Sequence, residues 1–238
     1  MYDLPCFMKT ISSRLSLWSI LLLFTTITTP AQQEPSPEVG FVRVISLLNA
    51  SRGKTQIIID GSDIYPAGYD VGQKTGGIGL KVGPHSISLH QQGLPPVTAQ
   101  FTLNRGETLT WIGYAEKVVS NPPNDPPLWQ NRLLPVKQSD SQSGDHLILV
   151  SLCPQDEIQL QIQTPQNLRA QTTRLKRLLP NRLDLWMPKN EFTLKIDDAI
   201  IRHVSLEDPG NYQILLYADE AGKIHALSFE SPSFTPAG

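Results

Sequence analysis

Two stretches about a hundred residues apart repeat one apolar pattern, and this repeat constrains the fold more than any other feature. The first stretch is FTLNRGETLTWIGYAE, residues 101–116, and the second is VSLEDPGNYQILLYADE, residues 204–220. They align without a gap at an offset of 103 residues, so Leu103 meets Leu206. Each has the pattern of two strands around a turn, and Gly106 supplies the turn of the first.

Two upstream blocks extend the repeat in the same order. VISLL, from Val44, lies over LVSLC, from Leu149, and LKVGPHSISLH, from Leu80, lies over LWMPKNEFTLK, from Leu185. Both offsets are 105 residues. The apolar positions agree and the polar ones do not. We therefore predict a tandem duplication that preserves architecture, because a duplicated active site would have kept its polar residues.

The first hairpin is apolar on both sides. Alternation in LTWIGY places Leu109 and Trp111 on one face of the strand and Ile112 and Tyr114 on the other. We expect both faces to be buried.

Elsewhere the pattern is also β. In EIQLQIQ the apolar residues Ile158, Leu160 and Ile162 alternate with polar ones, which predicts a half-buried strand. Strand-like runs recur about every 8–12 residues with turn signals between them, the spacing of a β-sandwich. The predicted fold is all-β, with two tandem antiparallel β-sandwich (Ig-like) domains joined by a Pro-rich linker.

Composition shifts set the predicted boundaries. The linker holds five prolines among Asn, Asp, Ser and Gln, which favours a semi-rigid connection. The predicted parts are a signal peptide (1–31), a lead-in (32–38), a first sandwich (39–119), the linker (120–145), a second sandwich (146–230) and a tail (231–238).

The N-terminus has the pattern of a secretory signal. Lys9 and Arg14 precede the apolar run 15–24, and Thr29 and Ala31 fit the small residues before a cleavage site. The alternative is an uncleaved anchor, but the run is shorter than the ~20 residues that a spanning helix needs. We predict cleavage after Ala31, a periplasmic or secreted protein, and no transmembrane segment after signal removal.

Charge and cysteine content narrow the function classes. The formal net charge is −2, which gives no bias toward nucleic acid. Cys6 would leave with the signal, so Cys153 has no partner for an internal disulfide. Cys153 ends the apolar run LILVSLC and is predicted to be a small buried residue.

The first copy resembles a class of bacterial exported β-sandwich domains, most of which have no assigned function. The resemblance rests on FVRVISLLNAS, IIIDG, VGPHSISL and FTLNRGETLTWIGY. Two such sandwiches behind a signal are similar in order to the periplasmic accessory proteins of alginate O-acetylation. That resemblance implies an adaptor in a cell-envelope assembly and no catalyst. Within it, Asn49-Ala50-Ser51 is the end of the first strand.

No motif predicts a reaction or a cofactor. The five histidines lack the spacing of a local zinc site, and no G-x-S-x-G nucleophile elbow is present. Asp197-Asp198 and Glu207-Asp208 are read as turn residues, with a calcium site as the alternative. We therefore predict that the chain is not an enzyme. A site assembled only in three dimensions remains an alternative.

One segment, 168–182, is locally basic and free of acidic residues. It is predicted to be either a short helix, with Leu168, Leu175, Leu178 and Leu179 on one face, or a long loop. Its charge could bind an anionic polysaccharide, a lipid surface or an acidic protein partner. The alternative is a solvated connection between strands. The candidate binding residues are Arg169, Arg174, Lys176, Arg177 and Arg182.

These observations favour a non-catalytic adaptor or binding protein of the cell envelope, supporting exopolysaccharide O-acetylation of the alginate type. Its expected partners are envelope proteins or an anionic polysaccharide. A structural envelope protein without a specific ligand is the alternative.

Overall fold

A computed structural model describes residues 38–48, 52–118, 128–138, 146–165, 171–184, 190–206 and 210–231. Over these ranges the chain forms strands and turns and no α-helix, so the all-β prediction is confirmed. The strands are β1 (Val39–Leu47), β2 (Thr55–Ile59), β3 (Ser62–Asp63), β4 (Ile78–Lys81), β5 (Gly83–Gln91), β6 (Val97–Leu103), β7 (Thr108–Val118), β8 (Leu128–Lys137), β9 (His146–Ser151), β10 (Glu157–Gln163), β11 (Gln171–Lys176), β12 (Asn181–Asp184), β13 (Asn190–Ile196), β14 (Ala199–Leu206), β15 (Asn211–Ala218) and β16 (Ile224–Glu230).

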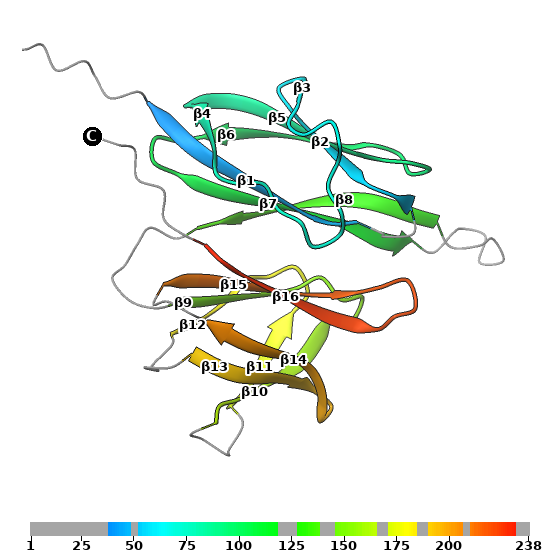
Figure 1. Ribbon diagram of the computed structural model, residues 1–238, viewed down its shortest axis with the longest axis vertical. Helices are drawn as coiled ribbons and strands as arrows, with labels where there is room; N and C mark the ends of the chain where they lie inside the picture. Colours follow the sequence, from blue (N-terminus) through cyan, green and yellow to red (C-terminus); the bar gives the residue numbers. More distant parts are fainter. Residues whose placement is uncertain are drawn as a thin grey trace, which may run out of the picture. The chain divides into compact units, whose positions relative to one another are not determined.

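The first eight strands form two facing four-stranded sheets (Figure 1). One sheet has the order β4-β1-β7-β8 and the other the order β3-β2-β5-β6. Period-two alternation turns one face of each sheet inward. Ile57 and Leu89 from one sheet meet Val44 and Trp111 from the other in a common buried core. We call this unit the first sandwich.

The last eight strands repeat the arrangement as the second sandwich. Its sheets have the orders β12-β9-β15-β16 and β11-β10-β13-β14, which are the orders of the first sandwich with every strand number raised by eight. Leu160, Leu175 and Leu194 from one sheet are fully buried against Leu149 and Ile214 from the other. The two predicted copies thus share one topology.

The strand register also matches the sequence alignment. Val44 lies opposite Trp111 in the first sandwich, and Leu149 lies opposite Ile214 in the second. These pairs are related by the same offsets of 105 and 103 residues that align the two blocks in the sequence. The copies differ at the β13–β14 pair, where a bulge between Leu194 and Lys195 shifts the register.

One part of the antiparallel prediction is wrong. β1 pairs with β7 in parallel, and β9 pairs with β15 in parallel. Each pair joins the first strand of a sandwich to a strand near its end. No tight hairpin connects them, so nothing forces the antiparallel direction that a short turn would impose.

A third apolar layer lies between the two sandwiches. Ile112 and Tyr114, on the outer side of β7, pack in one cluster with Val150 and Leu215 from the second sandwich and with Phe229 on β16. The predicted division of the hairpin is therefore confirmed, because Leu109 and Trp111 lie in the first core instead. The two sandwiches belong to one compact unit.

Polar contacts border this layer. The buried Arg43 donates from Nη1 to the Glu230 carbonyl at 3.0 Å, and Gln138 donates from Nε2 to the Ser231 carbonyl at 2.7 Å. The Lys74 ammonium lies 5.0 Å from the centre of the Phe229 ring, within range of a cation–π contact. These contacts join the first sandwich to the end of β16 and to Ser231, which follows it. They come from β1, from Lys74 in the segment before β4, and from Gln138, which follows β8.

Part of the predicted linker is a strand. Residues 128–137, which the sequence assigns to the linker, form β8 and pair along their whole length with β7. The prolines of the segment suggested a connection, but Pro135 is tolerated because β8 is the edge strand of its sheet in the described part of the chain. Val136 is buried in the layer between the sandwiches.

The basic segment is neither a helix nor a long loop where it is described. Residues Gln171–Lys176 form β11, which pairs antiparallel with β10. The alternation of side chains decides this outcome: Leu175 is fully buried, whereas Arg174 and Lys176 on either side of it are exposed. A helix could not bury Leu175 and keep this cross-strand pairing.

The predicted turn at Asp197-Asp198 and the predicted burial of Cys153 are confirmed. Asp197-Asp198 forms a two-residue turn between β13 and β14, with positive φ at both residues, and Asp60-Gly61 does the same between β2 and β3. Gly and Asp adopt this conformation more readily than most residues. Cys153 is fully buried and free, and burial raises the pKa of its thiol.

Several predictions lie outside the described residues. They are the signal peptide, most of the lead-in, Asn49-Ala50-Ser51, residues 120–127 and 139–145 of the linker, Glu207-Asp208 and the tail from residue 232. Within the described ranges, no helix is long and apolar enough to cross a membrane.

The layer between the sandwiches should contribute to stability as a core does. Leu215→Ala should lower the free energy of unfolding by about 2–5 kcal/mol, because it opens a cavity at a fully buried position. Leu128→Ala is the matched control: the same side chain is lost from a residue that is 61% exposed. Urea denaturation measures both. Equal effects of the two variants would contradict a packed layer.

Candidate functional site

The outward side of sheet β11-β10-β13-β14 is the part of the second sandwich where polar side chains gather. On β10, alternation buries Ile158, Leu160 and Ile162 and turns the intervening glutamines outward. We call this side the outer face. Its polar members, the glutamines of β10 included, are Glu157, Gln159, Gln161, Gln163, Thr172, Arg174, Lys176, Glu191, Thr193, Lys195, His203 and Ser205.

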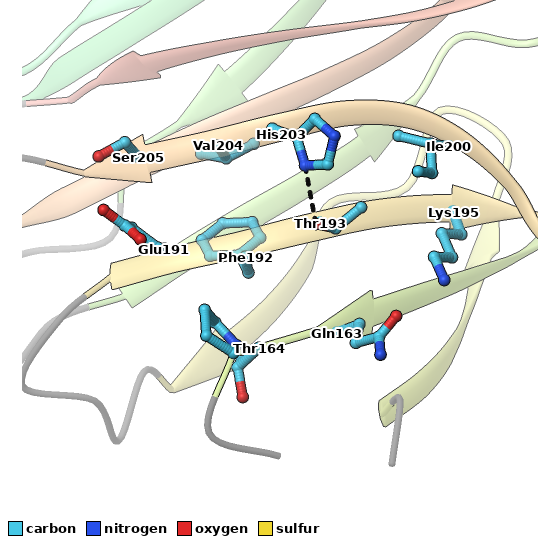
Figure 2. A pocket seen from close by; sticks show the side chains of 11 residues that line it. Gln163, Thr164, Glu191, Phe192, Thr193, Lys195, Ile200, His203, Val204 and Ser205 are labelled. Carbon is cyan, nitrogen blue, oxygen red and sulfur yellow. Dashed lines mark hydrogen bonds between the residues drawn. The ribbon is translucent and has the colours of Figure 1, made fainter. Parts of the chain in front are cut away.

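Cross-strand register aligns these side chains into rows. Gln161 on β10 lies opposite Lys195 on β13, and Thr193 on β13 lies opposite His203 on β14. Figure 2 shows the hydrogen bond of 2.9 Å that joins the Thr193 hydroxyl to Nδ1 of His203. The bulge after Leu194 brings Ile200 opposite Lys195, so an exposed apolar side chain borders the row.

A hollow of about 450 Å³ lies over β13 and β14 on this face (Figure 2). Gln163, Thr193, Lys195, His203 and Ser205 contribute to its lining. They supply an amide, two hydroxyls, an ammonium and an imidazole. Such groups can hydrogen-bond a polar ligand, and the ammonium can pair with an anion.

The polar residues of the hollow do not form a complete nucleophile–base–carboxylate arrangement among the described residues. Ser205 and His203 are two residues apart on one strand, which puts them about 6.6 Å apart along it. That separation is beyond hydrogen-bond reach. Thr193 does contact His203, as a nucleophile contacts a base, but no carboxylate among the described residues bonds to the other nitrogen of His203. The third group that orients a base is thus missing from this part of the chain.

Two of the predicted basic residues lie on the outer face. Arg174 and Lys176 project outward from β11, opposite Gln159 and Glu157 of β10. The Arg174 side chain is 72% exposed, and its Nε is 3.9 Å from a Glu157 oxygen. Both cations therefore remain accessible to solvent on the same face as Lys195.

The other predicted basic residues lie elsewhere. Arg177 follows the end of β11, donates from Nε to the Cys153 carbonyl at 3.1 Å and pairs with Glu116 of the first sandwich. Arg182, on β12, contacts the His146 ring of the neighbouring strand. Arg169 lies outside the described residues. Sequence proximity thus grouped side chains that the fold separates.

Lys195 and His203 were missed by sequence reasoning. Alternation in FTLKID and in RHVSL puts both on the polar side of their strands. That signal was present, but nothing in the sequence showed that β11, β10, β13 and β14 are neighbours. The order of strands within the sheet brings the two residues onto one face with Arg174 and Lys176.

The corresponding face of the first sandwich lacks this charge. The outward residues of β2, β5 and β6 include no Lys, Arg, Asp or Glu. At the position equivalent to Thr193 and His203, the Ser88 hydroxyl bonds to the Thr98 hydroxyl at 2.8 Å. On these strands the first sandwich has an exposed imidazole, His90, opposite Gln56, but the Lys and Arg side chains of the outer face belong to the second copy alone.

The described residues hold no group of three or more His, Cys, Asp or Glu side chains that could bind a metal ion. No protein-family model matches the chain, and no curated protein matches it.

The ion pair between Arg177 and Glu116 predicts a pH dependence of stability. The hydrogen bond from Arg177 lowers the pKa of the Glu116 carboxyl; burial opposes this, and Arg132, whose Nε is 2.9 Å from Oε2, lowers it further. Because the pKa of this carboxyl is lower in the folded than in the unfolded state, its ionised form stabilises the fold at pH values above the unfolded-state pKa. This contribution is lost as the pH falls through the folded pKa.

Glu116→Gln should therefore lower the free energy of unfolding at pH 7 by about 1–3 kcal/mol and reduce its loss toward pH 3. Glu157→Gln is the control, because it removes the exposed pair with Arg174 and should change stability by less than about 1 kcal/mol. Urea titrations at several pH values give both quantities. If the pH dependence of stability were unchanged in Glu116→Gln, the prediction that Glu116 contributes to it would be wrong.

Proposed function

We propose that this chain is a non-catalytic, exported binding protein of the cell envelope, and that the outer face of the second sandwich binds an anionic polysaccharide. The observation that carries the proposal is the group of three accessible cations, Arg174, Lys176 and Lys195, on a sheet face rich in amides and hydroxyls.

The chemistry of the face matches that ligand. Amide and hydroxyl side chains hydrogen-bond sugar hydroxyls, and the cations pair with carboxylates. The described residues of the face hold three cations against two carboxylates, Glu157 and Glu191, whereas the whole chain has a net charge of −2. One strand of seven residues spans about 20 Å, enough to contact several units of an extended polymer.

Four parts of the proposal rest on the sequence. Export rests on the signal pattern of residues 1–31, and a role as an adaptor in alginate-type O-acetylation rests on the resemblance of the tandem strand motifs. The Ig-like character of the sandwiches and a connecting role for residues 120–127 and 139–145 also belong to the proposal. Co-purification of a membrane-bound acyltransferase with the tagged full chain tests the adaptor role.

Alginate is a suitable probe for the outer face. We expect the purified chain to bind alginate and not neutral dextran, with affinity that falls as ionic strength rises, because exposed charges are screened by salt. The triple variant Arg174→Ser, Lys176→Ser, Lys195→Ser should bind at least about tenfold more weakly. Affinity electrophoresis or biolayer interferometry measures each constant.

The control removes the same charge from other surfaces. Lys54→Ser, Lys81→Ser and Lys117→Ser together replace three exposed lysines of the first sandwich. This variant should retain affinity within about twofold. If both triple variants lost the same affinity for alginate, the binding would depend on the overall charge of the protein and not on the outer face. If the wild type did not bind alginate, a structural envelope protein without a specific ligand would be favoured.

A further inference from the structure

A second hollow, of about 430 Å³, is lined by residues of both sandwiches. Leu47, Leu48 and Trp129 line it from the first sandwich, and Tyr217, Asp219 and His225 line it from the second. We call it the junction cleft. It shares no lining residue with the outer face. Clefts of this volume where two folded units meet are common positions for small-molecule sites.

The polar part of the lining of the junction cleft is held in place by the turn between β15 and β16. Asp219 Oδ1 accepts a hydrogen bond of 2.9 Å from the Lys223 amide, and Asp219 Oδ2 lies 2.8 Å from Nε2 of His225. The His225 ring stacks on Tyr217, with ring centres 5.5 Å apart and planes 28° apart. The carboxylate, the imidazole and the phenol thus have defined positions before any ligand arrives.

Another part of the lining is apolar. Leu48 is fully buried, Leu47 is nearly so, and the Trp129 ring is partly exposed at the start of β8. An apolar wall beside aromatic rings favours a ligand with a hydrocarbon or aromatic body.

Charge selects the head group of that ligand. Two lining residues, Asp219 and Glu220, carry carboxylates, and no Lys or Arg is among the described residues that line the cleft. The hydrogen bond from His225 lowers the pKa of Asp219, as does the one from the Lys223 amide, so this carboxylate is ionised at neutral pH. Aromatic rings attract cations through their negative faces.

We propose that the junction cleft binds a small organic cation, with its apolar body against Trp129 and its ammonium group near Asp219 and Glu220. The outer face offers cations to an anionic ligand, whereas the cleft offers carboxylates and aromatic rings to a cationic one. Because the two sites share no lining residue, binding at each can be tested independently of the other.

Benzyltrimethylammonium is the probe for this site, measured by isothermal titration calorimetry on the full chain. Benzyl alcohol and benzenesulfonate have the same aromatic body with a neutral and an anionic head. The cation should bind at least about tenfold more tightly than the alcohol, and the sulfonate should not bind. Equal binding of the three compounds, or no binding of the cation, overturns the proposal.

Variants locate the binding. Glu220→Gln removes one carboxylate and leaves the hydrogen bonds of Asp219 in place, and Trp129→Leu removes one aromatic ring while keeping an apolar side chain. Each should weaken the cation at least about fivefold, and the double variant more. Glu191→Gln, which removes a carboxylate from the outer face, is the matched control and should leave affinity unchanged. Retained affinity in the double variant would place the cation elsewhere and overturn the assignment.

Discussion

The parallel pairing of β1 with β7, and of β9 with β15, is the interaction on which the rest of the structure depends. These strands lie at the centre of their sheets and are buried on both faces. Trp111 faces the first core while its neighbour Ile112 faces the other sandwich. A strand apolar on both faces needs two covers. One cover is the facing sheet of its own sandwich, and the other is the equivalent sheet of the second copy.

This requirement decides where a ligand can bind. The two central sheets bury each other through Ile112, Val150 and Leu215, so neither can offer a broad polar surface. Only the two outer sheets retain one face toward solvent. Of these, the sheet of the second sandwich carries Arg174, Lys176 and Lys195, whereas the described strands of the equivalent sheet in the first sandwich carry no Lys or Arg. The position of the candidate site therefore follows from the packing of the core.

Sequence predicted the periodic part of this structure. The apolar pattern identified both copies, the inward residues of β10 and the division of β7 into two buried faces, and the paired acids predicted the turn at Asp197-Asp198. These features depend on side chains close together in the chain. The alternation that sends Arg174 and Lys176 outward was readable as well, but the segment lacked a clear strand boundary and its leucine spacing also fitted a helix.

What sequence did not predict depends on partners that are distant in the chain. Pro135 is incompatible with a central strand, and only the edge position of β8 makes it acceptable. The parallel direction of β1 and β7 depends on a pairing across more than sixty residues. Arg177 illustrates the same limit: it is adjacent to Lys176, yet its side chain leaves the outer face once β11 ends and pairs with Glu116 of the other sandwich.

Comparison of the two copies shows which positions are free to carry function. Ser88 and Thr98 occupy the same register position as Thr193 and His203, and both pairs form a cross-strand hydrogen bond. The bond is conserved while the chemistry changes from two hydroxyls to a hydroxyl and an imidazole. Because outward positions do not contribute to either core, such replacements cost little stability. A duplicated sandwich can thus acquire a charged binding face in one copy while the buried strands of both copies keep the register that holds them together.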